Sequence, residues 1–260
     1  MSKKPSPIVQ GKTFTDTLRW METPLVFKPI SGISLASGAP RLTVSGHGIA
    51  NKWPVAITRV VGMRGINCQN QTPDIRRDGD YVDATRIDVS TLELNGVSPV
   101  DDMGNAWSAW ESGGFIQYYK PVSLADKTIR AVLRRSVSDR LLLKCSVGGV
   151  SGQTRPTAVG TDGGVTWVAT TLQSNKAWEP GATYLADDVI DAKALIFLST
   201  ETSGVVADDA NKEIVVTITD EVTAGLAKQT LYYEVEAEDA AGAVRLVSAT
   251  YIDVCLEGAP

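Results

Sequence analysis

Histidine is nearly absent from this sequence, whose 260 residues contain only His47. A Ser-His-Asp hydrolase is not indicated, because the sequence has no Gly-x-Ser-x-Gly nucleophile elbow. A metal site would have to combine His47 with carboxylates or thiolates at unpredictable spacings. His47 stands between Gly46 and Gly48, where a neutral imidazole can bond to a backbone carbonyl while the glycines allow positive φ. We therefore predict that His47 marks a structural turn, and we expect no metal and no cofactor.

Cysteine is scarce and dispersed. Cys68, Cys145 and Cys255 are odd in number and far apart. Disulfide frameworks normally use an even number of cysteines, and zinc sites use paired short spacings. The sequence therefore predicts three free thiols in a protein assembled in a reducing cytoplasm.

Excess positive charge and long apolar runs are missing as well. The formal net charge is −5 and the pI is about 5.0, so a basic stripe for nucleic acid is not expected. No apolar run approaches the ~20 residues that span a bilayer, and the polar N-terminus has no signal-peptide core. We expect a soluble protein that binds other proteins or neutral glycans, and neither nucleic acid nor membrane. Any role outside a cell would then be played within a larger particle.

Strand patterns dominate what is present. Hydrophobic residues make up 43% of the chain, which is enough for a packed core. Alternating runs are separated by Gly, Pro, Asn and Asp clusters about every 8–12 residues, the spacing of sandwiches and small barrels. Only residues 220–227 suggest a short helical turn, with Asp220 as its N-cap. We predict an all-β protein with strands at Ile87–Leu94, Ile129–Leu133, Glu213–Thr219, Leu231–Glu238 and Val244–Val254.

Motifs in the outer parts of the chain follow a defined order. Gly-Lys-Thr-Phe at 11–14 opens a strand pattern that resumes at 115–135 and again at 195–255. These pieces resemble the immunoglobulin-like N-terminal domain of phage upper-baseplate and tail-fibre proteins. The resemblance covers about half of the chain and implies an interrupted β-sandwich. The matching positions are Pro121, Val122, Leu124, Thr128, Arg130, Ile214, Val216, Ile218, Thr223, Ala224, Tyr233, Glu236, Gly242, Val244, Arg245 and Leu246.

Residues 46–67 open the strongest motif, which begins with Gly-His-Gly and ends with Ser-Gly-Gly at 112–114. It resembles the small β-barrel module named after a catalytic-cysteine half-domain of ubiquitin-activating enzymes, which phage tail proteins use as an insert. The resemblance implies no enzymatic activity, because the catalytic cysteine of those enzymes lies outside this module. The polar segment 68–80 departs from the pattern, and we expect it to be an exposed loop. The matching positions are Gly46, His47, Gly48, Val55, Ile57, Val60, Gly62, Met63, Asn67, Leu92, Leu94, Val97, Ser112, Gly113 and Gly114.

Five aromatic residues are candidates for contact with a glycan or a protein. Trp167, Trp178 and Tyr184 lie in two half-patterns that resemble, in reversed order, small modules similar to chitin-binding modules. Their rings can stack on a sugar or fill the core of a small domain, and we favour core filling. Trp107 and Trp110 lie at the exit of the first insert, where they can anchor a protein interface or close the barrel.

Three adjacent acid pairs, Asp101-Asp102, Asp187-Asp188 and Asp208-Asp209, occur at loop-like places. Carboxylates can hold calcium or perform glycoside hydrolysis. Adjacent acids in loops are more often turn residues or caps, and none of the pairs fits an EF-hand. We therefore expect turn residues.

The sequence as a whole predicts an immunoglobulin-like β-sandwich interrupted by two small β inserts. The resemblances imply a non-enzymatic structural protein of a bacteriophage virion, in the tail tip, baseplate or collar, that holds a tail fibre or receptor-binding protein. Its partners would be other tail or baseplate proteins and further copies of itself, as a homo-oligomer or a ring. The alternatives are a glycan-binding module that attaches to the host surface and, for want of an evident acid/base pair, a less favoured depolymerase. The expected segments are 1–28, 115–138 and 194–260 for the sandwich, 29–114 for the barrel insert and 139–193 for the second insert.

Overall fold

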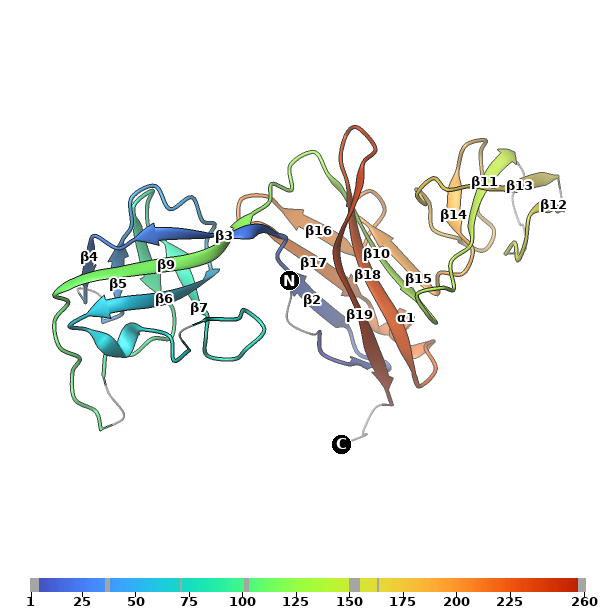
Figure 1. Cartoon of the computed structure of the whole chain (residues 1–260). Helices are drawn as coiled ribbons and strands as arrows, with labels where there is room; N and C mark the ends of the chain where they lie inside the picture. Colours follow the sequence, from blue (N-terminus) through green and yellow to red (C-terminus); the bar gives the residue numbers. More distant parts are fainter. Residues whose placement is uncertain are drawn as a thin grey trace. The chain divides into compact units, whose positions relative to one another are not determined.

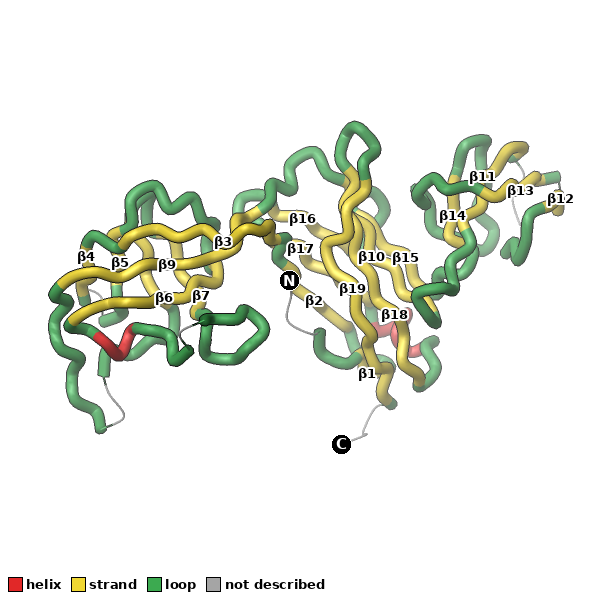
Figure 2. The backbone as a smooth tube through the Cα atoms, viewed as in Figure 1, coloured by secondary structure: helices red, strands yellow, loops and turns green. Residues whose placement is uncertain are grey.

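The computed structural model has 47% of its residues in strands and 3% in helices, which confirms the all-β prediction. The chain divides into two compact units (Figure 1, Figure 2). Arg19–Ala125 and Asp208–Glu213 belong to the first unit, and the segments on either side of them belong to the second. No helix among the described residues is long and apolar enough to cross a membrane. The structure describes residues 5–35, 38–70, 72–100, 103–149, 155–162 and 164–256.

Seven strands form the sheet of the first unit. They are β3 (Met21–Pro29), β4 (Gly32–Ser34), β5 (Arg41–Thr43), β6 (Trp53–Val61), β7 (Val82–Arg86), β8 (Thr91–Leu94) and β9 (Ser112–Pro121), and a 3-10 turn, η1 (Arg64–Ile66), follows β6. Their order is β3-β9-β6-β7-β8-β5-β4, and all neighbours are antiparallel.

The two end strands of this sheet, β3 and β4, are joined directly by Ile30 and Ser31. The Ile30 N–H donates to the Gly114 carbonyl of β9 at 2.9 Å, and the Ser31 N–H donates to the Thr43 carbonyl of β5 at 2.9 Å. Two consecutive residues thus bond to opposite ends of the sheet, and the sheet closes into a barrel. The barrel strands span 21–121, which is longer at both ends than the expected insert at 29–114.

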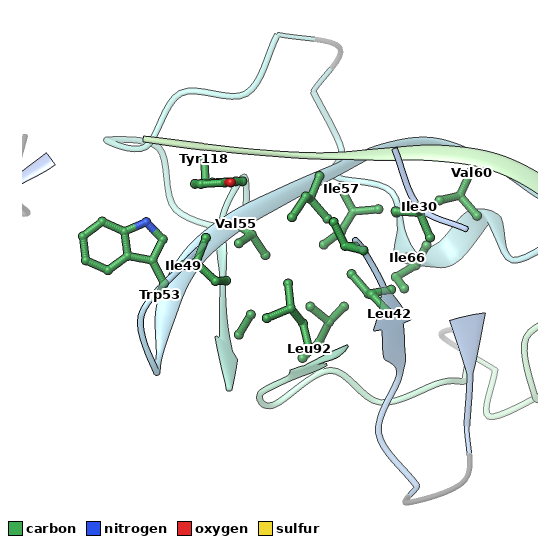
Figure 3. Close-up of a cluster of buried hydrophobic side chains, with 14 of the residues drawn as sticks. Ile30, Leu42, Ile49, Trp53, Val55, Ile57, Val60, Ile66, Leu92 and Tyr118 are labelled. Carbon is green, nitrogen blue, oxygen red and sulfur yellow. The ribbon is translucent and has the colours of Figure 1, made fainter. Parts of the chain in front are cut away.

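One cluster of buried side chains fills the barrel (Figure 3). Its largest member is Trp53, which is fully buried and donates its indole N–H to the Tyr119 carbonyl at 2.8 Å. Burial of each large aliphatic side chain stabilises the fold by about 1.5–3 kcal/mol. The side chains labelled in the figure are Ile30, Leu42, Ile49, Trp53, Val55, Ile57, Val60, Ile66, Leu92 and Tyr118.

The residues of the Gly-His-Gly motif build this barrel. The side chain of Asn67 accepts the N–H of Val60 at 2.8 Å and donates to the Val60 carbonyl at 3.1 Å, which fixes the end of β6. Gly62 has φ +88°, and a Cβ there would lie 2.2 Å from the Ala109 carbonyl oxygen, so no larger residue fits. The buried apolar positions of the motif are Val55, Ile57, Val60, Met63, Leu92 and Leu94.

The second unit contains two sheets that pack face to face. The five-stranded sheet has the order β1-β19-β18-β10-β15, and the three-stranded sheet has the order β16-β17-β2. Phe14 and Tyr233, one from each sheet, meet edge to face with ring centroids 6.3 Å apart, so the sheets enclose a common core. The strands are β1 (Ile8–Val9), β2 (Phe14–Leu18), β10 (Thr128–Arg134), β15 (Ile196–Ser199), β16 (Val205–Asp208), β17 (Glu213–Ile218), β18 (Gln229–Glu238) and β19 (Val244–Cys255).

A smaller sheet lies within the predicted second insert. Its order is β12-β13-β11-β14, with strands β11 (Leu142–Val147), β12 (Gly160–Asp162), β13 (Val165–Ala169) and β14 (Val189–Asp191). Its own buried cluster consists of Leu143, Cys145, Val165, Trp167, Tyr184, Ile190 and Ala192.

Two local predictions are wrong. The run Ile87–Leu94 forms a strand only from Thr91, because the Asp88 carboxylate accepts the Ser90 N–H at 2.7 Å and makes a turn. The helix α1 (Asp220–Ala224) is present, but its N-cap is Thr219, and Asp220 is its first helical residue. An acid is favourable there because it faces the positive end of the helix dipole.

Candidate functional site

His47 is buried in the first unit with both ring nitrogens engaged. Its Nε2 lies 2.9 Å from the Asp88 carbonyl oxygen, and its Nδ1 accepts the Ile49 N–H at 3.3 Å. The bonding pattern assigns the proton to Nε2. The Tyr118 hydroxyl donates to the His47 carbonyl. The imidazole therefore has no lone pair left for a metal or a substrate. Its two hydrogen bonds hold the turn at 46–49 against the Asp88 carbonyl.

Burial lowers the pKa of His47, and the bond to the Asp88 carbonyl opposes that shift. The folded state then binds a proton less readily than the unfolded state. The contribution of neutral His47 to the free energy of unfolding is therefore complete above the ordinary histidine pKa of about 6.5, and it is lost as the pH falls below that value. We expect urea midpoints measured between about pH 7 and pH 5 to fall more steeply for the wild type than for His47→Gln. Parallel pH profiles of the two proteins would contradict this assignment.

The acid pairs are turn residues wherever the structure describes them; Asp101-Asp102 lies outside the described residues. Asp208 accepts the N–H groups of Ala210 and Asn211 at 2.9 and 3.1 Å. Asp209 pairs with Lys212 at 2.6 Å, and this bond contributes most to a pKa lowered to about 2.

The second acid pair is occupied in the same way. Asp188 pairs with Lys176 at 2.9 Å and accepts the Leu185 N–H at 2.8 Å, while Asp187 pairs with Lys144 at 2.6 Å. Within the described part of the chain, no group of His, Cys, Asp and Glu side chains is arranged to hold a metal ion. The three thiols of Cys68, Cys145 and Cys255 are free, as predicted.

The aromatic residues of the second insert form one cluster. Trp167 is 2% exposed and meets Tyr184, which is fully buried, edge to face at 5.4 Å. Trp178 stacks on Tyr184 with centroids 5.1 Å apart and an interplanar angle of 5°. Trp178 is only partly buried, so it alone of the three presents ring surface to a partner. Trp167 and Tyr184 belong to the buried core of the small sheet.

Trp107 and Trp110 are half-buried against the core of the barrel. Trp110 donates its indole N–H to the Gly113 carbonyl at 3.1 Å. Trp107 covers Gly65 so closely that a Cβ there would lie 2.5 Å from the indole. Both indoles thus pack on the barrel, and each keeps part of its surface exposed.

A groove lies on the outer face of the barrel, and the sequence did not reveal it. Its volume is about 940 Å³, within the range of small-ligand sites. Its floor is the outer face of β3, β9 and β6, where Gln117 is the register partner of both Phe27 and Ala56, and Phe115 is that of Thr58. The lining residues are Leu25, Phe27, Thr58, Arg59, Asn67, Cys68, Gln69, Asn70, Thr72, Pro73, Phe115 and Gln117.

One wall of this groove comes from residues 67–70 and 72–73, which are organised by a buried carboxylate. Asp80 is 2% exposed, accepts the Asn70 side-chain amide and the Asp74 N–H at 3.0 Å, and pairs with Arg77 at 3.0 Å. These bonds, led by the one from Asn70, lower the pKa of Asp80. The described residues of 68–80 form a loop that is exposed or half-buried except at Asp80, as expected, and the bonds to Asp80 hold it in place.

No family model, curated protein or solved structure matches this chain. The groove and the aromatic cluster are therefore interpreted from their own geometry.

Proposed function

We propose that this protein is a structural component of a bacteriophage virion, an adaptor in the tail tip, baseplate or collar that holds a tail fibre or a receptor-binding protein. The observation that carries the proposal is the Gly-His-Gly motif at 46–67, followed by its later elements and flanked in order by the immunoglobulin-like motifs. Phage tail proteins use such a module as an insert. Here too the barrel lies between two segments of one other unit.

Exposed apolar side chains on the second insert support an adaptor role. Water-exposed apolar surface is costly, and a partner protein that covers it gains binding free energy. The insert also carries the partly buried Trp178, a residue type enriched at protein interfaces. The exposed large apolar side chains there are Val147, Val159, Val168, Leu172 and Leu185.

The proposed role is geometric and involves no catalysis. The one histidine of the chain has both ring nitrogens bound to backbone groups. Sheets whose turns are held by internal hydrogen bonds are rigid, and a rigid protein can fix the position of the tail protein that binds to it. Copies of such an adaptor are expected to form a symmetric oligomer or a ring.

The proposal is tested on particles purified from the strain that encodes the chain. Mass spectrometry is expected to find the polypeptide in several copies per particle, and a low-resolution map should locate it in the tail. Particles assembled without it should lack a fibre or receptor-binding protein. Particles that never contain the polypeptide, or that keep all fibres when it is deleted, would refute the role.

A further inference from the structure

The outer groove of the barrel has an apolar part that solvent reaches. Phe27 is 58% exposed and Phe115 is 37% exposed, and both project from the sheet toward the groove beside Leu25. The opposite sides of the same strands supply Ile116 and Tyr118 to the barrel core, so the fold of the barrel does not require phenyl rings on the outer side. Exposed aromatic rings in a concave site are suited to a ligand with a flat apolar face.

The groove also has a polar part made of hydrogen-bond donors. Gln117 is 5% exposed, and its Nε2 has no hydrogen-bond partner among the described residues. A buried amide without a partner costs free energy, which a ligand oxygen would recover. The neighbouring amides of Asn67 and Asn70 are already bonded to Val60 and Asp80.

Arg59 gives the groove its charge. It is exposed, no carboxylate among the described residues pairs with it, and none of the residues that line the groove is acidic. Arg59 also has φ +60° within β6, a left-handed conformation that costs a non-glycine residue about 1–2 kcal/mol. Strained residues of this kind cluster at binding sites.

We propose that this groove binds an acidic saccharide, a pyranose that carries a carboxylate. The C–H face of the sugar ring packs on Phe27 and Phe115, the carboxylate pairs with Arg59, and a ring oxygen or hydroxyl accepts from Gln117. An added peptide strand is disfavoured at the middle of the groove floor, because β9 is already paired on both sides, with β3 and with β6. This proposal is independent of the virion role, because a tail adaptor could hold its protein partner whether or not the groove binds a saccharide.

The test is titration calorimetry and NMR titration of the full chain with three acidic probes: tetrasaccharides of galacturonic acid and of hyaluronate, and sialyllactose. Each is matched by its methyl ester, which keeps the ring and removes the charge. At least one acid is expected to bind, and its ester about tenfold more weakly. Shifts should centre on the amides around Phe27, Phe115 and Gln117.

Three variants assign the contacts. Arg59→Asn keeps a residue type that tolerates the left-handed backbone and should weaken binding about tenfold. Gln117→Leu removes the amide while filling its volume, and Phe27→Ala removes an exposed ring; both should weaken binding and leave the urea midpoint nearly unchanged. Arg64→Asn removes a nearby exposed charge outside the groove and should bind like the wild type.

Any one of four results would overturn the proposal. The proposal is wrong if none of the acidic saccharides binds at millimolar concentration, if the esters bind as well as the acids, or if Arg59→Asn binds as tightly as Arg64→Asn. A short phenylalanine-containing peptide with a free carboxyl group that binds in the groove more tightly than every saccharide would likewise reject it and identify a peptide site.

Discussion

Replacing Arg134 with alanine is expected to lower the free energy of unfolding of the second unit by about 3–5 kcal/mol. Arg134 on β10 is 2% exposed and pairs with Glu234 on β18 and, at 2.8 Å, with Asp191 at the end of β14. Asp191 has a side chain only 1% exposed and also accepts the Lys193 N–H at 3.1 Å. Without the guanidinium, two carboxylates remain in a poorly hydrated place without their ion-pair partner.

Urea denaturation measures the loss, and hydrogen exchange of the β10 and β18 amides locates it. Arg135→Ala is the matched control, because Arg135 is the next residue and is exposed. A combined Arg134→Met, Glu234→Leu, Asp191→Asn variant should recover much of the stability, since the cost comes from unpaired charge more than from a lost attraction. If Arg134→Ala is as stable as Arg135→Ala, the buried network does not stabilise the unit.

Alternation in the sequence predicted strands where one side of the strand faces a core. β17 has the burial pattern expected of Glu213–Ile218, with Ile214, Val216 and Ile218 buried, and β18 and β19 lie close to their predicted bounds. The prediction failed at Ile87 and Val89, which are 46% and 65% exposed, because Asp88 forms a turn there. A short polar side chain can outweigh an apolar pattern when it bonds to its own backbone.

The groove could not be predicted in the same way. Phe27 and Gln117 belong to distant parts of the chain and face the same side only through the register of β3 with β9. The sequence predicts a strand pattern around Gln117, but nothing in it shows that the side-chain amide lacks a hydrogen-bond partner. His47 was predictable because its glycine neighbours are adjacent in sequence, whereas its acceptor, the Asp88 carbonyl, comes from the misread segment.

Replacing Trp167 with alanine is expected to cost about 3–5 kcal/mol and to unfold the small sheet of the second insert locally. The core of this sheet is small, and Trp167 is one of its two large fully enclosed side chains, the other being Tyr184. The neighbours cannot collapse onto the space left by an indole without losing their own contacts. Hydrogen exchange of the β11 and β13 amides should accelerate strongly, while amides of the barrel keep their protection.

Trp178→Ala separates packing from recognition in the same cluster. Trp178 is partly buried and stacks on Tyr184, so its removal should cost less than that of Trp167: about 0.5–1.5 kcal/mol for the lost stacking, plus the area that it buries. Near-ultraviolet circular dichroism should register the lost stacking while the sheet remains folded. Equal destabilisation by the two substitutions would mean that Trp178 is as much a core residue as Trp167. If Trp178→Ala stays folded and is clearly more stable than Trp167→Ala, the exposed ring surface of Trp178 is available to contact a neighbouring protein. An adaptor role then predicts that Trp178→Ala binds this neighbour more weakly.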